Sequence, residues 1–296
     1  RDLRMSRGLG DVYKRQGYRL IMVNKDNPVI SVIMGIYNEK RKDYVIQAIN
    51  SILEQSYENF EYIICDDGSE EKFYMWLQKI CKKDPRIRLI HNKNNRGLAY
   101  TLNRCIEMAR GTYLARMDAD DISKKDRLKK QLFFLESHQE YAMVGCNAEF
   151  IDDKGVWGIY QMIERPQKRD FLKTSVFIHP AILIRTDVMK KMGGYSTEIR
   201  ALRTEDYELF MRIYAAGFQG YNMQEKLFQY REDINAFSKR KYRYRINEAV
   251  IRYHGFYSLG ILKGNFRYVI KPLIIGLIPG MLMERHRKKF FSKKRI

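Results

Sequence analysis

From Val29 onward, short apolar runs rich in β-branched residues alternate with segments of helical periodicity. In the first such pair, Val29–Ile36 is predicted to be a strand, and the apolar residues of Val45–Leu53 recur at the spacing of one helix face. Strands that alternate with amphipathic helices are typical of a parallel sheet with crossover helices. The pattern therefore predicts an α/β protein whose ligands bind at the carboxyl ends of the strands.

The first half of the chain continues this alternation, and the second half is less regular. Further strands are predicted at Phe60–Cys65, Ile87–His91 and Tyr113–Met117, with helices at Glu70–Lys83 and Leu98–Ala109. The second half is predicted to be a mixed α/β arrangement. Its strands are predicted near Met143–Ile151 and Ala181–Ile184, and its helices at Asp126–Ser137, Thr186–Met192 and Glu205–Ala216. After Ser238 the composition becomes basic and aromatic and then apolar, which indicates a domain boundary. We expect a tail at 1–27, a main domain at 28–238 with a nucleotide-binding half (28–122) and an acceptor and catalytic half (123–238), and an extension at 239–296.

Polar residues follow three of the predicted strands. The first strand leads into Tyr37-Asn38-Glu39, the second into Asp66-Asp67-Gly68-Ser69 and the fourth into Asp118-Ala119-Asp120-Asp121. Such residues also cap helices and form turns. Three carboxylates within four positions repel one another unless a cation is present, however, and their oxygens suit Mg²⁺ or Mn²⁺ bridging to a diphosphate. An aromatic ring and a carboxylate at the other two tips, Tyr37 and Asp67, would together hold a uracil ring.

In this order and at these separations, the motifs resemble the family 2 glycosyltransferases. That family has the GT-A fold, a Rossmann-like, mostly parallel sheet flanked by helices. The matching elements lie between Ile30 and about Ser238, and they are Ile30–Glu39, Asp66–Ser69, Asn95–Leu98, Met117–Asp121 and Thr204–Leu209. The resemblance therefore covers most of the chain.

The resemblance implies a role for each matching position. Tyr37 and Asp67 would contact the uracil of a UDP-sugar, and Glu39 and Asn95 would line the donor pocket. The ribose and diphosphate region would be contacted by Asp118, and the divalent metal would be held by Asp120 together with Asp118. Many members carry an Arg five residues after the glycine of the Asn-x-Gly element, whereas this chain has Leu102 there.

Asp206 matches the family's proposed catalytic base, with Glu205 beside it as a second catalytic carboxylate. Transfer with inversion requires a carboxylate that takes the proton from the acceptor hydroxyl as it attacks. Two acidic residues that open a helix would also complement its dipole. His179 either lines the acceptor side or is a structural histidine. Tyr230-Arg231 and Ser238 resemble a loop that closes over the diphosphate in related enzymes.

The net charge indicates an anionic partner. The chain carries a formal charge of +20, and its basic residues crowd the last twelve positions, after the apolar stretch Tyr268–Met283. This stretch would be about 24 Å long as a helix, short of the ~30 Å hydrocarbon core, and it contains Pro272 and Pro279. We therefore expect a helical extension that associates in plane with an anionic membrane surface. The alternative is a buried helical hairpin with a solvated tail.

Several features bear on the compartment of the protein. The four cysteines form no C-x-x-C pair and are expected to be reduced thiols. Arg1–Gln16 has no periodicity and is interpreted as a foreign leader, with Met22 the expected natural start, and no signal peptide is recognised. We expect a cytoplasmic protein bound peripherally to the inner face of the plasma membrane.

The sequence thus predicts an inverting glycosyltransferase of the hexosyl- or N-acetylhexosaminyl-transferase class. It would move a sugar from a UDP-sugar to a hydroxyl of a glycan or lipid-linked acceptor in bacterial surface polysaccharide synthesis. A sugar nucleotidyltransferase is one alternative, but Tyr37-Asn38-Glu39 stands where its glycine- and arginine-rich loop is expected. A catalytically inactive membrane-bound scaffold of the same fold is another. Nucleic acid is not an expected partner, because no helix-turn-helix, zinc or RNA-binding signature is present.

Overall fold

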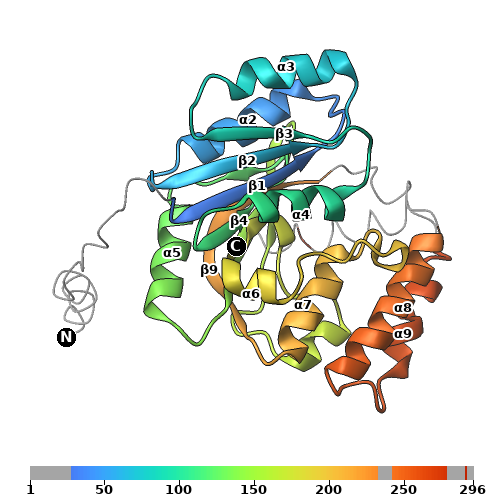
Figure 1. Cartoon of the computed structure of the whole chain (residues 1–296). Coiled ribbons are helices and arrows are strands. Elements are labelled where there is room, and N and C mark those ends of the chain that lie inside the picture. Colours follow the sequence, from blue (N-terminus) through green and yellow to red (C-terminus); the bar gives the residue numbers. More distant parts are fainter. Residues whose placement is uncertain (1–27, 233–241, 279–290, 292–296) are drawn as a thin grey trace, which may run out of the picture.

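The first half of the chain forms four parallel strands joined by helices. The computed structural model describes residues 28–232 and 242–278, together with Phe291. The strands are β1 (Ile30–Ile36), β2 (Phe60–Asp66), β3 (Ile87–His91) and β4 (Tyr113–Arg116), and the helices between them are α2 (Lys42–Leu53), α3 (Glu71–Cys81) and α4 (Leu98–Met108). Each predicted strand and helix of this half is confirmed, with bounds that differ by a few residues (Figure 1).

The second half extends the same sheet. Its strands are β5 (Ile122–Ser123), β6 (Met143–Asp152), β7 (Gly155–Tyr160), β8 (Leu183–Arg185) and β9 (Gly220–Arg231). The order across the sheet is β3-β2-β1-β4-β8-β6-β9-β5, and β7 pairs with β6. From the pairings, β8, β7 and β5 run opposite to the other described strands, so the sheet is mostly parallel, as expected.

Three of these strands were not predicted, and one was misplaced. β9 escapes the periodicity because Gln224-Glu225-Lys226 interrupts its apolar pattern where the pairing with β6 shifts register. β5 and β7 are short. The predicted strand at Ala181–Ile184 is wrong at its start, since a turn of 3-10 helix containing Pro180 occupies His179–Ala181.

The sheet curls so that its β5 end returns to the first half of the chain. Only Met117–Asp121 separates β4 from β5, yet β5 pairs with β9 at the far end of the strand order. β5 also contacts the first half directly, because the backbone N–H of Ser123 donates to Oγ of Ser51 on α2 (3.1 Å). The acidic segment after β4 therefore crosses between the two halves of the fold.

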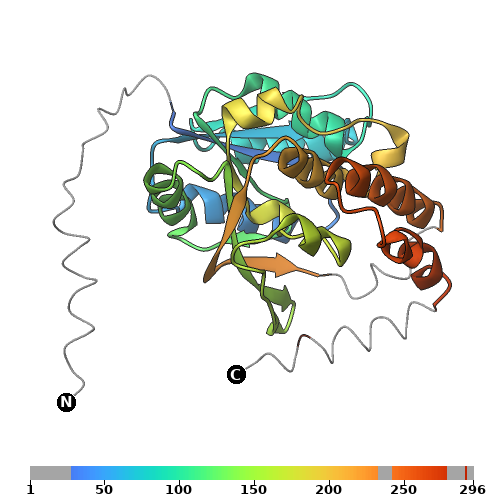
Figure 2. The ribbon, with the colours of Figure 1, turned by 90° about the horizontal axis from the view of Figure 1, so that it is seen from below.

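Helices cover both faces of the sheet. One apolar core lies under α2, α3 and α5 (Arg127–Ser137). The other lies under α4, α6 (Thr186–Lys191) and α7 (Glu205–Ala215). Figure 2 shows the sheet edge-on between these layers. All four cysteines are buried and free.

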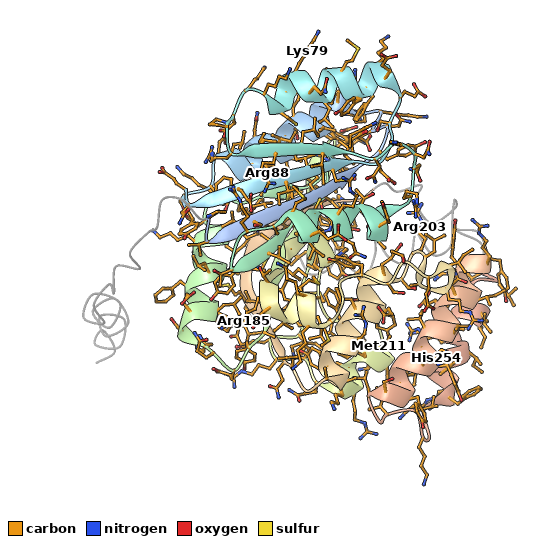
Figure 3. The ribbon with its side chains drawn as sticks, in the orientation of Figure 1. Lys79, Arg88, Arg185, Arg203, Met211 and His254 are labelled. Carbon is orange, nitrogen blue, oxygen red and sulfur yellow. The ribbon has the colours of Figure 1, made fainter. Side chains whose placement is uncertain are left out.

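The C-terminal extension begins with an antiparallel helical hairpin, α8 (Arg243–Ser258) and α9 (Phe266–Ile275). Ile251, Phe256 and Val269 join the core beneath α7. Gly255 allows the close approach, because a Cβ there would lie 2.4 Å from Sδ of Met211 on α7. Figure 3 labels Met211 and the neighbouring His254 at this contact. None of the helices in the described part of the chain is long and apolar enough to cross a membrane. The domain boundaries remain predictions.

Candidate active site

Hydrogen bonds tie the carboxyl ends of β1 and β2 together. Asn38, in the left-handed region at φ 42°, donates its backbone N–H to Oγ of Ser69 (2.9 Å), and its side-chain oxygen accepts from the backbone N–H of Glu70 (2.9 Å). Gly68 combines φ 73° with a close approach, since a Cβ there would lie 2.6 Å from the carbonyl carbon of Asn94. Only glycine satisfies both conditions. The three loops after β1, β2 and β3 thus form one unit.

Asp67 is the centre of this unit. It is almost fully buried. One carboxylate oxygen accepts from Nδ2 of Asn92 (2.7 Å) and the backbone N–H of Arg96 (2.9 Å), and the other accepts from the backbone N–H of Gly97 (2.8 Å). Asp67 therefore organises the Asn-x-Gly element, a role that its sequence position did not reveal. Its second oxygen retains a lone pair for a further donor.

The remaining predicted donor residues of this half lie at the open edge. Tyr37 is 50% exposed, as a stacking platform requires, and Asn95 is exposed. Leu102 is fully buried in the core, so that position makes no donor contact.

Arg116, the last residue of β4, is a buried cation that the sequence analysis did not single out. Its side chain is 1% exposed, and Nη2 donates to a carboxylate oxygen of Asp118 at 2.6 Å. Residues two apart in an extended chain lie on the same side, which explains the pairing. The sequence does contain a signal for this residue, because an arginine here ends an apolar strand directly before an acidic cluster.

Asp120 lies among like charges. Burial, followed by the nearby carboxylates of Asp118 and Glu39, raises the pKa of Asp120 to about 7. Asp121 is fully buried, and burial together with Asp120 and Asp118 raises its pKa as well. The structure therefore places Glu39 and Asp118 near enough to Asp120 to influence its ionisation.

Arg231, at the end of β9, fixes the backbone of this segment. Its backbone N–H donates to Oδ1 of Asp121 (2.7 Å), and Nε donates to the carbonyl oxygen of Asp120 (2.8 Å). Its guanidinium also lies 3.7 Å from the ring centroid of Tyr44 on α2. The expectation of a closing loop is wrong for Tyr230 and Arg231, which belong to a paired strand, and Ser238 lies outside the described residues.

Asp206 opens helix α7 across from the acidic segment. Burial raises its pKa to about 6, and Glu205 adds to this, whereas backbone N–H groups and Arg116 lower it. At neutral pH the carboxylate is therefore largely ionised, and it is a stronger base than an ordinary aspartate. Arg203, three residues earlier and labelled in Figure 3, has a left-handed φ of 71°, a conformation that is uncommon for a bulky residue.

Glu205 faces a cleft that joins the two halves. The cleft is shallow and open, and it is lined by Arg96 and Tyr100 from the Asn-x-Gly side and by Leu202 and Glu205 from the segment that leads into α7. The loop 196–198 completes it. Glu205 therefore lies beside the Asn-x-Gly loop and does not line the same surface as the acidic residues after β4.

His179 and Tyr195 lie beside Arg116. Nε2 of His179 and the hydroxyl of Tyr195 share a hydrogen bond of 2.8 Å. Burial, then Arg116, lowers the pKa of His179 well below its usual range, so the imidazole is neutral. Burial raises the pKa of Tyr195, with Asp206 and Asp118 both contributing. His179 is thus a hydrogen-bonded structural neighbour of the site.

The acidic segment fits a divalent cation by charge. The Oδ2 atom of Asp121 is buried without a hydrogen-bond partner, and the carboxylate of Asp118 contributes to the raised pKa values of Asp120 and Asp121. A cation would relieve both conditions. Within the described residues, however, no three or more His, Cys, Asp and Glu side chains are already arranged as a metal site, and Asp118 is paired with Arg116. Side-chain movement would have to accompany binding.

Known proteins with similar sequences are glycosyltransferases by name. The family model described as "Glycosyl transferase family 2" matches residues 31–193. EpsE of Bacillus subtilis (strain 168), which carries a provisional glycosyltransferase name, is 40% identical over 263 residues, covering 88% of this chain and 94% of its own. TuaG of the same organism, provisionally named a teichuronic acid biosynthesis glycosyltransferase, is 30% identical over 73% of this chain and 84% of its own.

Solved structures match the fold. Residues 1–349 of S. aureus TarS in complex with UDP-GlcNAc superpose with a TM-score of 0.64 at 17% identity, covering 88% of this chain and 79% of that one. The mannosyltransferase PcManGT from Pyrobaculum calidifontis, in complex with GDP-Man and Mn²⁺, gives a TM-score of 0.57 at 16% identity over 90% and 84%. These similarities confirm the GT-A fold.

Proposed function

This chain is a member of glycosyl transferase family 2, and from that premise we propose that it transfers a sugar from UDP to a hydroxyl group with inversion. The single observation that carries the proposal is the position of Asp206. Its buried carboxylate has a raised pKa and is near enough to Arg116 to be influenced by that charge, and Arg116 pairs with Asp118 in the acidic segment that follows β4. A base on one side and a diphosphate-binding segment on the other are what in-line displacement requires.

The donor would lie across the carboxyl ends of β1, β2 and β4. Tyr37 offers an exposed ring for the base, and Asp67 holds the Asn-x-Gly loop while retaining an acceptor for a uracil N–H. Glu39 and Asn95 border the same edge. UDP is the nucleotide we propose, because Tyr37 and Asp67 match the positions that contact uracil in the family, and because TarS has been solved in complex with UDP-GlcNAc.

A divalent ion, Mg²⁺ or Mn²⁺, would be held by Asp120 together with Asp118. When bound, it would neutralise the charge that develops on the leaving diphosphate. Arg231 would keep Asp120 in place through the backbone, and Arg116 would orient Asp118. Arg116 acts here as a positioning residue, since its side chain is buried away from solvent.

Asp206 would remove the proton from the acceptor hydroxyl. The new bond to the anomeric carbon forms as the bond to the diphosphate oxygen breaks on the opposite face. Glu205 would line the sugar-binding cleft beside Arg96. The acceptor we propose is a glycan or lipid-linked glycan of a bacterial surface polysaccharide, met at the cytoplasmic face of a membrane. The name of TuaG, which refers to teichuronic acid biosynthesis, supports this class.

The test is to incubate the full chain with UDP- and GDP-sugars and Mn²⁺ and to measure release of the nucleoside diphosphate. We expect UDP release from one UDP-sugar, abolished in Asp206→Asn. Release of inorganic pyrophosphate from a sugar phosphate and UTP would instead identify a sugar nucleotidyltransferase. Binding of UDP without turnover of any sugar, with or without acceptors, would identify an inactive scaffold.

A further inference from the structure

The α8–α9 hairpin has an apolar side that the protein core does not use. On α8, Ile246, Tyr253 and Tyr257 are exposed and recur at helical spacing. On α9, the exposed residues Phe266, Ile270 and Ile274 do the same, and Leu277 in the turn after α9 is exposed as well. Tyr257, Ile274 and Leu277 are 73%, 59% and 74% exposed, which is unusual for such side chains.

Both rows lie on the solvent-exposed sides of their helices. The start of α8 meets the end of α9, where a Cβ on Gly276 would touch Tyr242 and Arg245, and Arg252 donates to the carbonyl oxygen of Tyr268 further along. At about 100° per residue, each exposed row lies on the side of its helix away from the buried residues Ile251 and Phe256 of α8 and Val269 of α9. We call the seven exposed apolar side chains the hairpin face.

Positive charge borders the hairpin face. Residues 242–278 contain six basic residues and one acidic residue, Glu248. Glu248 pairs with Arg245 and Arg252 inside the hairpin. The other four basic residues of this segment, Arg243, Lys263, Arg267 and Lys271, are exposed or half-buried, and Arg267 and Lys271 directly follow Phe266 and Ile270 in the chain. A second copy of this chain would bring like charges together at this surface. The exposed apolar and basic side chains therefore favour a partner that is anionic and has an apolar interior.

The hairpin is rigidly connected to the reaction site. Arg252 donates to the carbonyl oxygen of Leu172 (3.0 Å), and Gly255 packs against Met211 of α7, the helix that Asp206 opens. Nδ2 of Asn247 donates to the carbonyl oxygen of Ile199 (3.0 Å), in the loop that leads from the Glu205 cleft to α7. A partner that binds the hairpin would therefore also orient α7 and the segment that precedes it.

We propose that the hairpin face is a preformed docking surface for an anionic lipid bilayer, and that it places the catalytic side of the site at the membrane. Tyrosine and phenylalanine side chains enter the headgroup region, and the bordering cations contact lipid phosphates. α9 lies in the plane of the membrane. The identity of a lipid-linked acceptor rests on the proposed function, whereas docking itself does not.

Phe291, in the basic tail, is already packed against the sheet. Phe291 packs edge-on against Phe150 of β6 at 5.0 Å between ring centroids, and against Tyr160 of β7 at 5.7 Å. Phe291 is therefore already engaged by the sheet. The hairpin face therefore carries the proposal without Phe291.

The experiment is flotation of the full chain with phosphatidylcholine vesicles that contain or lack phosphatidylglycerol. The face variant is Tyr257→Ser/Phe266→Ser/Ile274→Ser. The matched control is Met75→Ser/Met108→Ser/Ile163→Ser, three exposed apolar residues elsewhere. We expect the face variant to lose about tenfold or more in partitioning onto anionic vesicles and the control to match the unmodified protein. Lys263→Gln/Arg267→Gln/Lys271→Gln should weaken binding to anionic vesicles and flatten its salt dependence.

Circular dichroism and the thermal midpoint should be unchanged in each variant, because the substituted side chains are exposed. Equal flotation of the face variant and the unmodified chain would overturn the proposal, as would flotation that ignores the anionic lipid. Loss of a dimer without loss of flotation would assign the face to a second copy. UDP release without vesicles should be the same in the face variant, so failure of docking and failure of the glycosyltransferase proposal are separate results.

Discussion

The guanidinium of Arg116 donates to the carboxylate of Asp118 at 2.6 Å, and the same buried cation lowers the pKa of Asp206 on the opposite side of the site. One strand-end residue therefore connects the proposed metal-binding segment to the proposed base. This relationship leads to several measurable consequences.

Asp206→Asn should lower kcat by about 10²–10⁴-fold, the usual range for loss of a general base, and leave UDP affinity unchanged. In the unmodified enzyme, kcat/KM should fall on the acid side with an apparent pKa of about 6, because only the ionised carboxylate accepts a proton. The pH profile of UDP release and calorimetric titration with UDP check both points. A profile that is flat down to pH 5 would remove Asp206 as the base.

Asp206→Asn should also stabilise the fold. Its pKa rises from 3.8 to about 6 on folding, so ionisation opposes folding; the cost is absent below pH 3.8 and complete above pH 6. The variant should therefore be about 1–3 kcal/mol more stable than the parent at pH 8, with no difference near pH 4. Urea unfolding at the two pH values measures this. A constant difference at both would mean that the effect is not electrostatic.

Arg116→Met should move the acid limb of the kcat/KM profile above pH 6, because the cation that lowers the pKa of Asp206 is gone. Arg116→Lys retains the charge and should keep the limb near its original position. The Met variant should also lose about 2–4 kcal/mol of stability, since it leaves Asp118 unpaired beside other carboxylates. An unchanged limb in the Met variant, with only stability lost, would reduce Arg116 to a structural role.

Asp120→Asn should abolish metal-dependent turnover, by about 100-fold or more, without unfolding the protein. The carboxylate lies at a strand end among like charges, so its removal relieves repulsion. Titration of the parent and the variant with Mn²⁺ in the presence of UDP should show binding only in the parent. Full activity of the parent in excess EDTA would contradict the metal proposal.

Asp67→Ala should weaken UDP binding by about tenfold or more, because it removes both the proposed base contact and the anchor of the Asn-x-Gly loop. Asp67→Asn should have an intermediate UDP affinity, since its one remaining side-chain oxygen can accept only some of the hydrogen bonds that the carboxylate accepts. The control is Tyr37→Phe, which keeps the stacking ring and should bind UDP normally. Unchanged UDP affinity in both Asp67 variants would place the uracil elsewhere.

Local sequence patterns were sufficient to predict the strands and helices in the first half of this protein. The alternation of Val29–Ile36 and its successors with amphipathic segments was enough to predict the parallel strands, because strand and helix periods are local properties. The motif spacing identified the family and its acidic residues for the same reason. β9 was missed because its charged centre hides a strand that only pairing with β6 stabilises.

Tertiary structure alone decided how those residues are used. Arg116, Arg231 and Asp206 belong to β4, β9 and α7, and no local pattern reports that the curled sheet brings them together. The pKa of Asp206 depends on burial and on a cation 90 residues away in the chain. The hairpin face also exists only in three dimensions, because packing of α8 on Met211 decides which side of the helices is covered and which is left to a partner.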